Sequence, residues 1–312
     1  MKYSIVIPVM NEEDSIKELI EKIMSAMKSL ASPDEYEIIF VDDGSTDKTL
    51  RNIKRGKKIH GDLIKFLSFR KNFGKSAALS VGISHAKGDI VITMDGDLQD
   101  EPSEIPAMVG QLKKGYDVVS GWKENRQDKI GKTLPSKVFN SMIGYMTGLH
   151  LHDFNCGFKV YTKQAAKEIV IYGQLYRFIP YILYERGFKI SERKVKHNKR
   201  KYGSSKYNWK RFFPGLMDLI TIVFISKYAK RPLHFFGFAG ALLILFGLGV
   251  LSYLTVLHFM GISVSERPIL TIGSTSLLAG LQLLFTGLLA ELLTKYNHKA
   301  NDYPISETDS SL

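Results

Sequence analysis

The sequence predicts an α/β domain with a mostly parallel sheet, followed by two apolar helices long enough to cross a membrane. Short apolar runs alternate with amphipathic segments up to Ser120, and acidic turns follow two of these runs. Strands that alternate with helices in this way indicate a parallel sheet flanked by helices. Residues 232–265 and 268–290 contain no Asp, Glu, Lys or Arg. A membrane-spanning helix needs about 20 apolar residues, so each stretch is long enough.

Five short segments have the composition of buried strands, because apolar residues dominate them and turn residues bound them. They are Ser4–Met10, Tyr36–Val41, Ile64–Phe69, Ile90–Met94 and Asp117–Ser120. After Trp122 this pattern weakens, and Leu151–Tyr161 is expected to be irregular.

The segments between the strands have the features of helices. Glu12–Leu30 carries apolar residues at helical spacing, and Pro102–Lys114 has a proline in its first turn. Gly74–His85 is a third predicted helix, and Ser45 or Thr46 is expected to cap the helix after the second strand. In a fold of this kind, ligands bind at the carboxyl ends of the strands.

The strongest chemical signal is the motif Asp95-Gly-Asp97-Leu-Gln99, which follows the fourth predicted strand. Two carboxylates one residue apart at the end of a strand can both reach one divalent cation, and Gln99 can add a neutral oxygen. Mg²⁺ and Mn²⁺ prefer such oxygen ligands and bridge to phosphates. The motif therefore predicts a site for Mg²⁺ or Mn²⁺ that holds the diphosphate of a nucleotide-sugar.

A second acidic turn, Asp42-Asp43-Gly44-Ser45, follows the second predicted strand. Asp42 and Asp43 can accept hydrogen bonds from the base or ribose of a nucleotide, and Pro8 and Glu12 would shape the opposite wall. The plainer interpretation is a turn that only leads into a helix. Its position at the end of a strand favours the nucleotide site.

The charge of the chain is strongly positive, with a formal net charge of +12 at pH 7. Seven Lys or Arg and no acid lie between Lys196 and Arg211, just before the apolar stretches. Such a run suits an anionic membrane surface or phosphate-bearing substrates, and a solvated loop is the plainer alternative. Nucleic acid is not expected as a partner, because no helix-turn-helix, zinc-finger or RNP-like pattern is present. The single cysteine, Cys156, excludes an intramolecular disulfide.

The C-terminal third predicts membrane spans over Leu233–Met260 and Ile269–Leu293, joined by a short turn. Phe212–Ser226 is apolar but short, and is expected to lie in the membrane interface. Basic residues flank the outer ends of the two spans, and only Arg267 lies in the turn, which predicts a cytoplasmic catalytic domain and cytoplasmic termini. The predicted division is a catalytic domain at 1–210, an interfacial helix at 211–231, a transmembrane hairpin at 232–295 and a polar tail at 296–312.

Several motifs together resemble family 2 glycosyltransferases of the GT-A fold. They are Ile7–Glu12, Asp42–Asp47, Arg70–Lys75 and Asp95–Gln99. More narrowly, His197-x-x-Arg200-x-x-Gly203-x-Ser205-Lys206 is similar to a late basic motif of the dolichol-phosphate mannosyltransferase group and of its bacterial relatives that load sugars onto undecaprenyl phosphate. The two predicted spans resemble the bacterial branch, and the resemblance covers nearly the whole chain apart from the tail.

The resemblance implies roles for residues that match the family's motifs. In the family, the nucleotide-sugar or its metal ion is contacted by the positions that match Pro8, Glu12, Asp43, Asp95 and Asp97. Arg200 and Lys206 match positions that reach the phosphates or the sugar as a mobile loop closes.

The resemblance also implies a site for the phosphate of an acceptor lipid. Lys132 and Ser136 match an Arg-x-x-x-Ser pair that grips this phosphate, and Lys123 stands at the family's other arginine position. Lysine keeps the charge but lacks the bidentate fork of arginine. Asp153 matches an acid of the related enzymes, and we expect it to orient the sugar or the nucleophile rather than to abstract a proton; the plainer interpretation is a loop acid that caps a helix.

The reaction expected from the resemblance is the inverting transfer of one sugar from a nucleotide-sugar to a polyprenyl phosphate in the bilayer. The acceptor oxygen is already anionic near neutral pH, so it needs no strong general base and attacks in line with the leaving diphosphate. The residues expected to carry the catalysis are Asp95, Asp97, Asp153 and Arg200. UDP is expected rather than GDP by analogy with the bacterial branch, and a homo-oligomer is expected because relatives form tetramers.

Two other functions are compatible with the sequence. One is a membrane glycosyltransferase with a different acceptor, which extends a glycan or glycosylates a diacylglycerol. Gln174-x-x-Arg177-Phe178 resembles the Gln-x-x-Arg-Trp signature of processive polysaccharide synthases, but it lacks the tryptophan. The other is a non-catalytic subunit that binds lipid or nucleotide.

Overall fold

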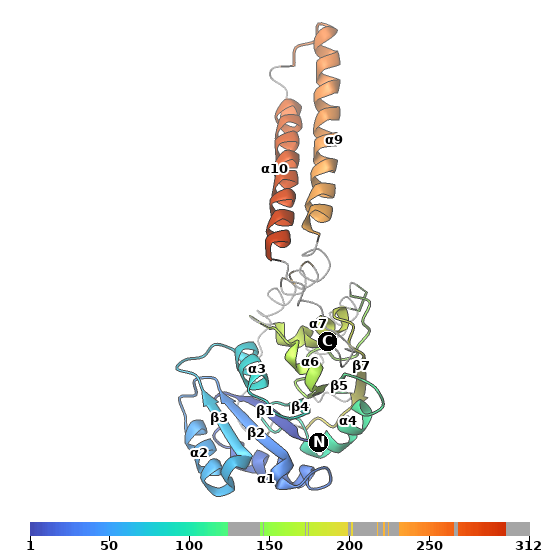
Figure 1. Ribbon diagram of the computed structural model, residues 1–312. Coiled ribbons are helices and arrows are strands. Elements are labelled where there is room, and N and C mark those ends of the chain that lie inside the picture. The colour runs from blue at the N-terminus through green and yellow to red at the C-terminus, as the bar shows by residue number, and fades with distance from the viewer. Residues whose placement is uncertain are drawn as a thin grey trace. The chain divides into compact units, whose positions relative to one another are not determined.

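The computed structural model describes most of the chain in two compact units, Met1–Leu219 and Ile220–Leu312 (Figure 1). The described residues are 1–123, 144, 145, 147–171, 173, 175–198, 201, 217, 221, 224, 231–264 and 268–297. Most of the predicted interfacial helix at 211–231, and the polar tail from residue 298 onward, lie outside them.

A seven-stranded sheet forms the centre of the first unit, in the order β3-β2-β1-β4-β6-β5-β7. The strands are β1 (Tyr3–Val9), β2 (Tyr36–Asp42), β3 (Ile64–Ser68), β4 (Ile90–Thr93), β5 (Val118–Trp122), β6 (Lys159–Thr162) and β7 (Ile190–Lys194). β6 runs antiparallel to β4 and β5, and the other neighbouring pairs are parallel. The predicted mostly parallel sheet is confirmed, and all five predicted strands are present.

The sequence prediction missed β6 and β7. β6 lies partly in the segment predicted to be irregular, and its four residues are too few for a clear apolar pattern. It includes Lys159, a charged residue that is nevertheless buried. β7 reads Ile-Ser-Glu-Arg-Lys and lies at the edge of the sheet, where its side chains are partly exposed. Edge strands of this kind need no apolar face, so their sequences resemble loops.

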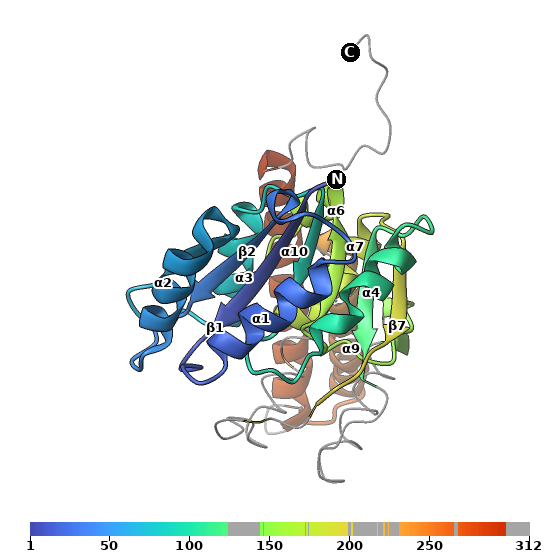
Figure 2. The same ribbon diagram turned by 90° about the horizontal axis from the view of Figure 1, so that it is seen from below.

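Helices cover both faces of the sheet (Figure 2). α1 (Ile16–Met27), α2 (Thr49–His60) and α4 (Ile105–Leu112) pack together as one group, while α3 (Lys75–Ser84) packs against α6 (Lys163–Lys167). Two short 3₁₀ helices, η3 (Pro102–Glu104) and η4 (Leu175–Phe178), precede α4 and α7 (Ile179–Glu185) respectively. Two further 3₁₀ turns, η1 (Pro33–Glu35) and η2 (Gly61–Leu63), lead into β2 and β3.

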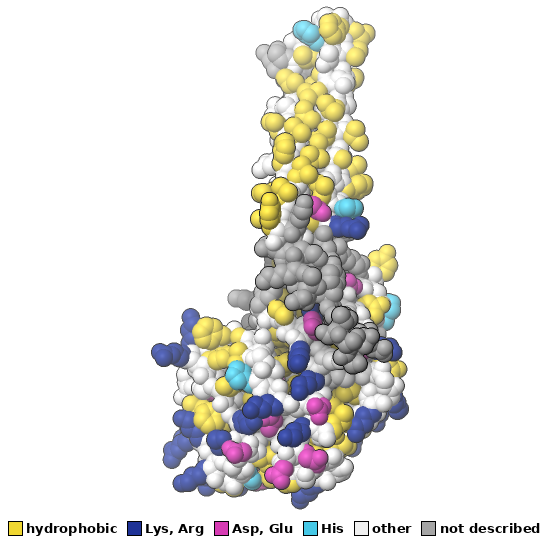
Figure 3. Space-filling model, viewed as in Figure 1, with side chains coloured by type: hydrophobic (Ala, Val, Ile, Leu, Met, Phe, Trp, Pro, Cys, Tyr) yellow, Lys and Arg dark blue, Asp and Glu magenta, His cyan; other side chains and the backbone are white. Residues whose placement is uncertain are grey.

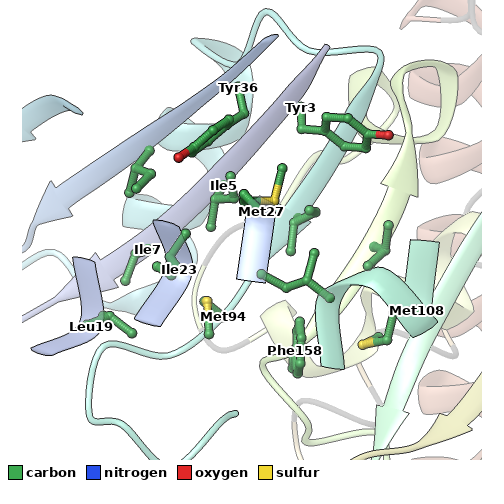
Figure 4. Close-up of a cluster of buried hydrophobic side chains, with 14 of the residues drawn as sticks. Tyr3, Ile5, Ile7, Leu19, Ile23, Met27, Tyr36, Met94, Met108 and Phe158 are labelled. Carbon is green, nitrogen blue, oxygen red and sulfur yellow. The ribbon is translucent and has the colours of Figure 1, made fainter. Parts of the chain in front are cut away.

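Alternation along β1 supplies both layers of the core. Ile5 and Ile7 belong to the main apolar cluster with residues of α1 and α4 (Figure 4). Val6 points to the other face, where a Cβ added to Gly82 of α3 would lie 2.4 Å from its Cγ1 atom. Only glycine therefore allows α3 to pack this closely. Burial on both faces explains why the central strands read as almost continuous apolar runs.

The prediction that Ser45 or Thr46 caps α2 is wrong, because the helix begins only at Thr49. The two residues bind Asn11 at the end of β1 instead. The Asn11 backbone N–H donates to Ser45 Oγ at 2.9 Å, and the Thr46 N–H donates to Asn11 Oδ1 at 2.8 Å. Asn11 has a φ of 54°, a left-handed conformation that asparagine tolerates better than most residues. These bonds tie the turns after β1 and β2 together.

The second unit contains two long helices, α9 (Pro232–Phe259) and α10 (Pro268–Asn297). Both are long and apolar enough to cross a membrane, with mean hydropathies of 2.2 and 1.7. Only 11% of the apolar 18-residue stretch in each helix is buried, and apolar side chains cover the visible face of the pair (Figure 3). The helices match the two predicted spans within a few residues. Exposed apolar helices of this length indicate membrane association.

Glycines allow α9 and α10 to pack closely along their length. A Cβ added to Gly240 would lie 2.7 Å from the Gly280 carbonyl oxygen, and one added to Gly247 would lie 2.8 Å from that of Gly273. The pairing is therefore antiparallel. Apolar surfaces gain little by associating inside lipid, so small residues that let two backbones approach are typical of membrane helix pairs.

Candidate active site

The turns after β1, β2 and β4 lie at the same edge of the sheet, because these strands are parallel neighbours. The Asp43 N–H donates to the Val9 carbonyl at 2.9 Å, which joins the first two turns. Ser15 Oγ donates to the Gly96 carbonyl at 2.7 Å, which joins the start of α1 to the turn after β4. The predicted donor-site residues Pro8, Glu12, Asp43, Asp95 and Asp97 therefore come from one edge of the sheet.

Asp42 and Asp43 form the enclosed side of this region. Asp42 is 1% exposed; its Oδ1 atom accepts from the Ser45 N–H at 3.0 Å and its Oδ2 atom accepts from Ser68 Oγ at 2.8 Å. Asp43 is 5% exposed and accepts from the N–H groups of Phe73 and Gly74, at 2.7 and 3.0 Å, before α3 begins. Every oxygen of the two carboxylates accepts a hydrogen bond from a loop or strand residue, so both side chains hold the local chain in place.

The turn after β4 is more open. Asp95, Asp97 and Gln99 are each partly exposed, whereas the intervening residues Gly96 and Leu98 are buried. Leu98 has a φ of 63°, and the Gln99 N–H donates to Asp97 Oδ1 at 3.1 Å. The three predicted metal ligands are therefore the accessible side chains of one tight turn.

A buried ion pair between Asp100 and Lys123 supports this turn. The side chain of Asp100 is fully buried; its Oδ2 atom accepts from the Asp95 N–H at 3.1 Å, and its Oδ1 atom lies 2.8 Å from Lys123 Nζ. Lys123 was expected at the acceptor phosphate, but only 10% of its side chain is exposed. Burial opposes the charged form of this lysine, yet the neighbouring Asp100 carboxylate outweighs it and raises the lysine pKa. In the structure, Lys123 thus contacts Asp100, the residue that holds the backbone of Asp95.

Lysines also keep Asp95 ionised. Lys75, the first residue of α3, forms an ion pair with Asp95 Oδ1. Burial opposes ionisation of the Asp95 carboxyl group, but the charges of Lys75 and Lys123 outweigh it and hold its pKa well below the usual range. Asp95 is therefore an anion at neutral pH, as a metal ligand must be.

The loop before β6 approaches the same carboxylate from the other side. A Cβ added to Gly157 would lie 2.5 Å from Asp95 Oδ1, so a side chain at this position would displace the carboxylate. Lys159 is 2% exposed and donates to the Cys156 carbonyl, and burial lowers its pKa. Lys159 also interacts electrostatically with Asp153 and Asp95. Glycine and a buried lysine thus shape the side of the site next to β6.

Asp153 is buried in this loop, and β7 holds its backbone. Its N–H donates to Glu192 Oε1 at 3.0 Å, and its Oδ1 atom accepts from the Asn155 N–H at 3.0 Å. The neighbouring His152 stacks on Trp122 with ring centroids 3.9 Å apart. The position of Asp153 is therefore fixed by strands β5 and β7.

The late basic motif begins beside the turn of Asp95–Gln99. The Asn198 N–H donates to the Gln99 carbonyl at 2.9 Å, and Gln99 Nε2 lies 3.3 Å from His197 Nε2. Further along, Lys201 Nζ donates to Glu18 Oε2 of α1 at 2.7 Å. Arg200, Lys206, Lys132 and Ser136 lie outside the described residues.

The site fits a divalent cation that takes part of its coordination from a substrate. The described residues contain no group of three or more His, Cys, Asp and Glu side chains able to hold a metal. Asp95 and Asp97 offer two carboxylates, and the Lys75 ammonium already provides a positive charge at one of their oxygens. Mg²⁺ typically binds one or two carboxylates and completes its shell with water and phosphate oxygens. The donor set therefore suits a cation bound together with a diphosphate.

Sequence reasoning gave no role to several residues that shape the site. Lys75, Gly157 and Lys159 approach Asp95 from other segments of the chain, whereas Asp100 contacts it from five residues further along the same segment. Lys75 stood inside a motif that carried the family resemblance, and this was the only available signal for it. A buried charged residue such as Lys159 often marks a functional site, but its burial becomes visible only in the structure.

Comparison with known proteins identifies the family. The model of glycosyl transferase family 2 matches residues 4–170, more than half of the chain. The chain belongs to glycosyltransferase family 2. The family match ends in the segment after β6, so it includes both acidic turns and the loop that carries Asp153.

Two relatives of this family 2 glycosyltransferase align with nearly its whole length. It is 37% identical to dodecaprenyl-phosphate galacturonate synthase of Rhizobium johnstonii, over 97% of this chain and 91% of that protein. It is 33% identical to undecaprenyl-phosphate 4-deoxy-4-formamido-L-arabinose transferase of Klebsiella pneumoniae, over 95% of this chain and 89% of that protein. Both alignments include the C-terminal apolar helices, because they cover at least 95% of the chain.

Solved structures share the fold of the first unit. Mannosyl-3-phosphoglycerate synthase of Rubrobacter xylanophilus has a TM-score of 0.56 and 16% identity, over 73% of this chain and 75% of that one. Glucosyl-3-phosphoglycerate synthase of Mycobacterium tuberculosis, in complex with Mn²⁺, UDP and phosphoglyceric acid, has a TM-score of 0.55 and 19% identity, over 72% and 78% of the two chains. The predicted GT-A fold is confirmed.

Proposed function

We propose that this family 2 glycosyltransferase transfers one sugar from a nucleotide-sugar to a polyprenyl phosphate, releasing the nucleoside diphosphate. The observation that carries the proposal is the open carboxylate turn of Asp95 and Asp97 in a chain that also has two exposed apolar helices. Two relatives that align with nearly the whole chain are named as transferring sugars to dodecaprenyl and undecaprenyl phosphate. An acceptor whose tail stays in the bilayer requires an enzyme that is held there.

Asp95, Asp97 and Gln99 are the residues that would hold Mg²⁺ or Mn²⁺ together with the donor diphosphate. When bound, the cation supplies a Lewis acid that stabilises the charge developing on the departing diphosphate. A mycobacterial synthase with the same fold was solved with Mn²⁺ and UDP-glucose, which supports this assignment. UDP is the nucleotide we propose for the donor.

The chain's own cations assist the donor site. Lys75 neutralises Asp95 in the absence of substrate. With a cation held at Asp95, the Lys75 ammonium would be available to the donor phosphates. Arg200 and Lys206 belong to the motif that begins next to Gln99, and we assign them to the phosphates or the sugar. The role proposed for these residues is to bind and orient the donor.

The acceptor needs positioning rather than a strong base, because its phosphate oxygen is already ionised near neutral pH. We assign Lys132 and Ser136 to this phosphate. Lys123 contributes through Asp100, which holds the backbone of Asp95. Asp153 is fixed by Glu192 and orients the sugar or the acceptor oxygen for an in-line, inverting attack.

The sequence supports a cytoplasmic position for the catalytic unit and both ends of the chain. Basic residues flank the outer ends of the two helices, namely Lys227, Lys230, Arg231, Lys295 and Lys299, and only Arg267 lies in the turn.

The sugar differs between the two relatives, one acting with galacturonate and the other with 4-deoxy-4-formamido-L-arabinose. A homo-oligomer stays a prediction.

The proposed function is tested by measuring UDP release by the purified full chain. The assay contains undecaprenyl phosphate, Mg²⁺ or Mn²⁺, and a panel of UDP-sugars that includes UDP-galacturonate. We expect release with one donor that requires both the lipid and the metal. Release that requires the metal but uses diacylglycerol or a glycan as acceptor would assign a different transfer, and no release with any donor would contradict the proposal.

A further inference from the structure

Arg177 is a buried arginine whose charge no described residue neutralises. The residue is only 6% exposed, and its Nε atom has no hydrogen-bond partner. The Cζ atom of Arg177 lies 5.5 Å from the centroid of the Tyr176 ring. Within the described part of the chain, the guanidinium group forms no ion pair. Arginine is almost never buried without a partner, because removing a charge from water is costly. An arrangement of this kind calls for an anion that the described residues do not supply.

The position of Arg177 connects it to the candidate active site. It lies in η4, and the N–H of the preceding Tyr176 donates to Ser76 Oγ in the first turn of α3 at 3.2 Å. Lys75 Nζ lies 5.0 Å from the centroid of the same Tyr176 ring and pairs with Asp95. Arg177 and Lys75 therefore share one aromatic neighbour, next to the positive N-terminal end of α3.

The local sequence separates a packing residue from a functional one. In the motif Gln174-x-x-Arg177-Phe178, Phe178 stands where the processive synthases have tryptophan, and it is fully buried in the core. Phe178 and Leu175 anchor η4 through apolar packing. This anchoring fixes the backbone on both sides of Arg177, and the burial of its side chain restricts where the guanidinium group can lie.

We propose that Arg177 binds a phosphate group of one of the two substrates, either the donor diphosphate or the phosphate of the acceptor lipid. This proposal rests on the proposed function, which brings both phosphates to this edge of the sheet. The planar guanidinium group can hold two phosphate oxygens at once, and such charge-assisted bonds are the strong ones. A neutral sugar hydroxyl would leave the buried charge uncompensated.

The test compares Arg177→Gln, Arg177→Met and the unaltered full chain in detergent. UDP binding in the presence of Mn²⁺ and undecaprenyl phosphate binding are measured separately from transfer, by calorimetry and by tryptophan fluorescence. Arg186→Gln is the matched control, because Arg186 forms a partly exposed ion pair with Glu168 at the end of α7. We expect Arg177→Gln to weaken one of the two probes about 10- to 100-fold, as lost hydrogen bonds to a charged group do, and Arg186→Gln to weaken neither.

The two binding measurements show which substrate supplies the phosphate. Weaker UDP binding assigns Arg177 to the donor diphosphate, and weaker lipid binding assigns it to the acceptor. The ligand-free Arg177→Met chain should unfold at the same temperature as the unaltered chain or at a higher one, because replacing an unpaired buried charge by an apolar side chain removes a cost. Arg177→Lys should recover part of the lost affinity, since it keeps the charge without the fork.

Unchanged affinity for both probes in Arg177→Gln would overturn the proposal. So would a lower unfolding temperature of the ligand-free Arg177→Met chain with both affinities unchanged, which would assign Arg177 to the fold. Failure of the proposed function gives a different result. In that case the unaltered chain binds the probes without transferring sugar, and the effect of Arg177→Gln on binding can still be measured.

Discussion

The two acidic turns of this enzyme are similar in sequence but engage their carboxylates in opposite ways. After β2, Asp42 and Asp43 are almost fully buried, and their oxygens accept hydrogen bonds from the protein itself. After β4, Asp95 and Asp97 are partly exposed, and lysines rather than backbone groups maintain the charge of Asp95. Position at the end of a strand therefore does not define the role of a carboxylate. Burial and hydrogen bonding separate a carboxylate that holds loops from one that can bind a cation.

The largest effect is expected from Asp97→Ala. This change removes one of two carboxylates from the proposed cation site, and transfer should fall about 1,000-fold, the size of effect typical for groups that stabilise charge in the transition state. Stability should change little, because Asp97 is partly exposed. Asp62→Ala, at a fully exposed position, is the control and should retain full activity. The measurement is lipid-dependent UDP release, and substantial turnover by Asp97→Ala would remove the metal assignment.

A smaller effect on turnover is expected from Gly157→Ala. The added methyl group would lie 2.5 Å from Asp95 Oδ1, so the carboxylate must shift away from its present position. We expect turnover to fall about 10- to 100-fold, because misplacing a catalytic group by about 1 Å has effects of that size. Gly110→Ala in α4 is the matched control, since a Cβ there meets no atom within 4 Å. Equal kcat values for the two variants would show that the position of Asp95 is not critical.

Asp42→Ala should act on stability instead. It removes the hydrogen bonds that the Ser45 N–H and the Ser68 hydroxyl donate to a carboxylate, and a hydrogen bond to a charged group contributes about 1.5–3 kcal/mol. The free energy of unfolding should therefore fall by about 2 kcal/mol, measured by denaturant titration of the solubilised protein. Turnover per folded molecule should stay close to that of the unaltered chain. A loss of turnover without a loss of stability would place Asp42 with the binding residues.

The smallest effect concerns Glu37, a carboxylate near the amino end of β2. Burial opposes its ionisation, but hydrogen bonds from Lys65, Ser4 and the Lys87 N–H outweigh this and lower its pKa below the ordinary value of 4.5. A lowered pKa in the folded state adds stability that is fully present above pH 4.5 and is lost as the pH falls through the folded-state value. Glu37→Gln should therefore flatten the acid side of the stability profile, measured by thermal unfolding at a series of pH values. An unchanged profile would mean that other carboxylates control it.

The sequence predicted the parts of this protein that depend on local patterns. The apolar runs of β1 to β5 and of the two long helices are continuous in sequence, so length and composition were sufficient to find them. Asp95 and Asp97 were found because a strand's end and a spacing of two residues are both visible in the sequence. β7 was missed because an edge strand such as Ile190–Lys194 has a polar composition.

The surroundings of the site could not be predicted, because they depend on contacts between distant segments. Lys75 and Gly157 come from two other segments and meet around Asp95, and the nearby Asp100 is buried against Lys123. Lys123 was expected at the acceptor phosphate from its place in a motif, but the motif carries no information on its ion pair with Asp100. In the sequence Arg177 is only part of an incomplete signature, and its burial without an ion pair among the described residues is visible only in the folded structure.

The contrast between the two turns is tested most directly by measuring Mn²⁺ binding. Electron paramagnetic resonance of Mn²⁺ would be recorded with UDP for the unaltered chain, Asp97→Ala and Asp42→Ala, each normalised to the folded fraction. We expect bound Mn²⁺ to disappear in Asp97→Ala and to be retained in Asp42→Ala. Retained binding in Asp97→Ala, or its loss in folded Asp42→Ala, would contradict the assignment of the cation to the turn after β4.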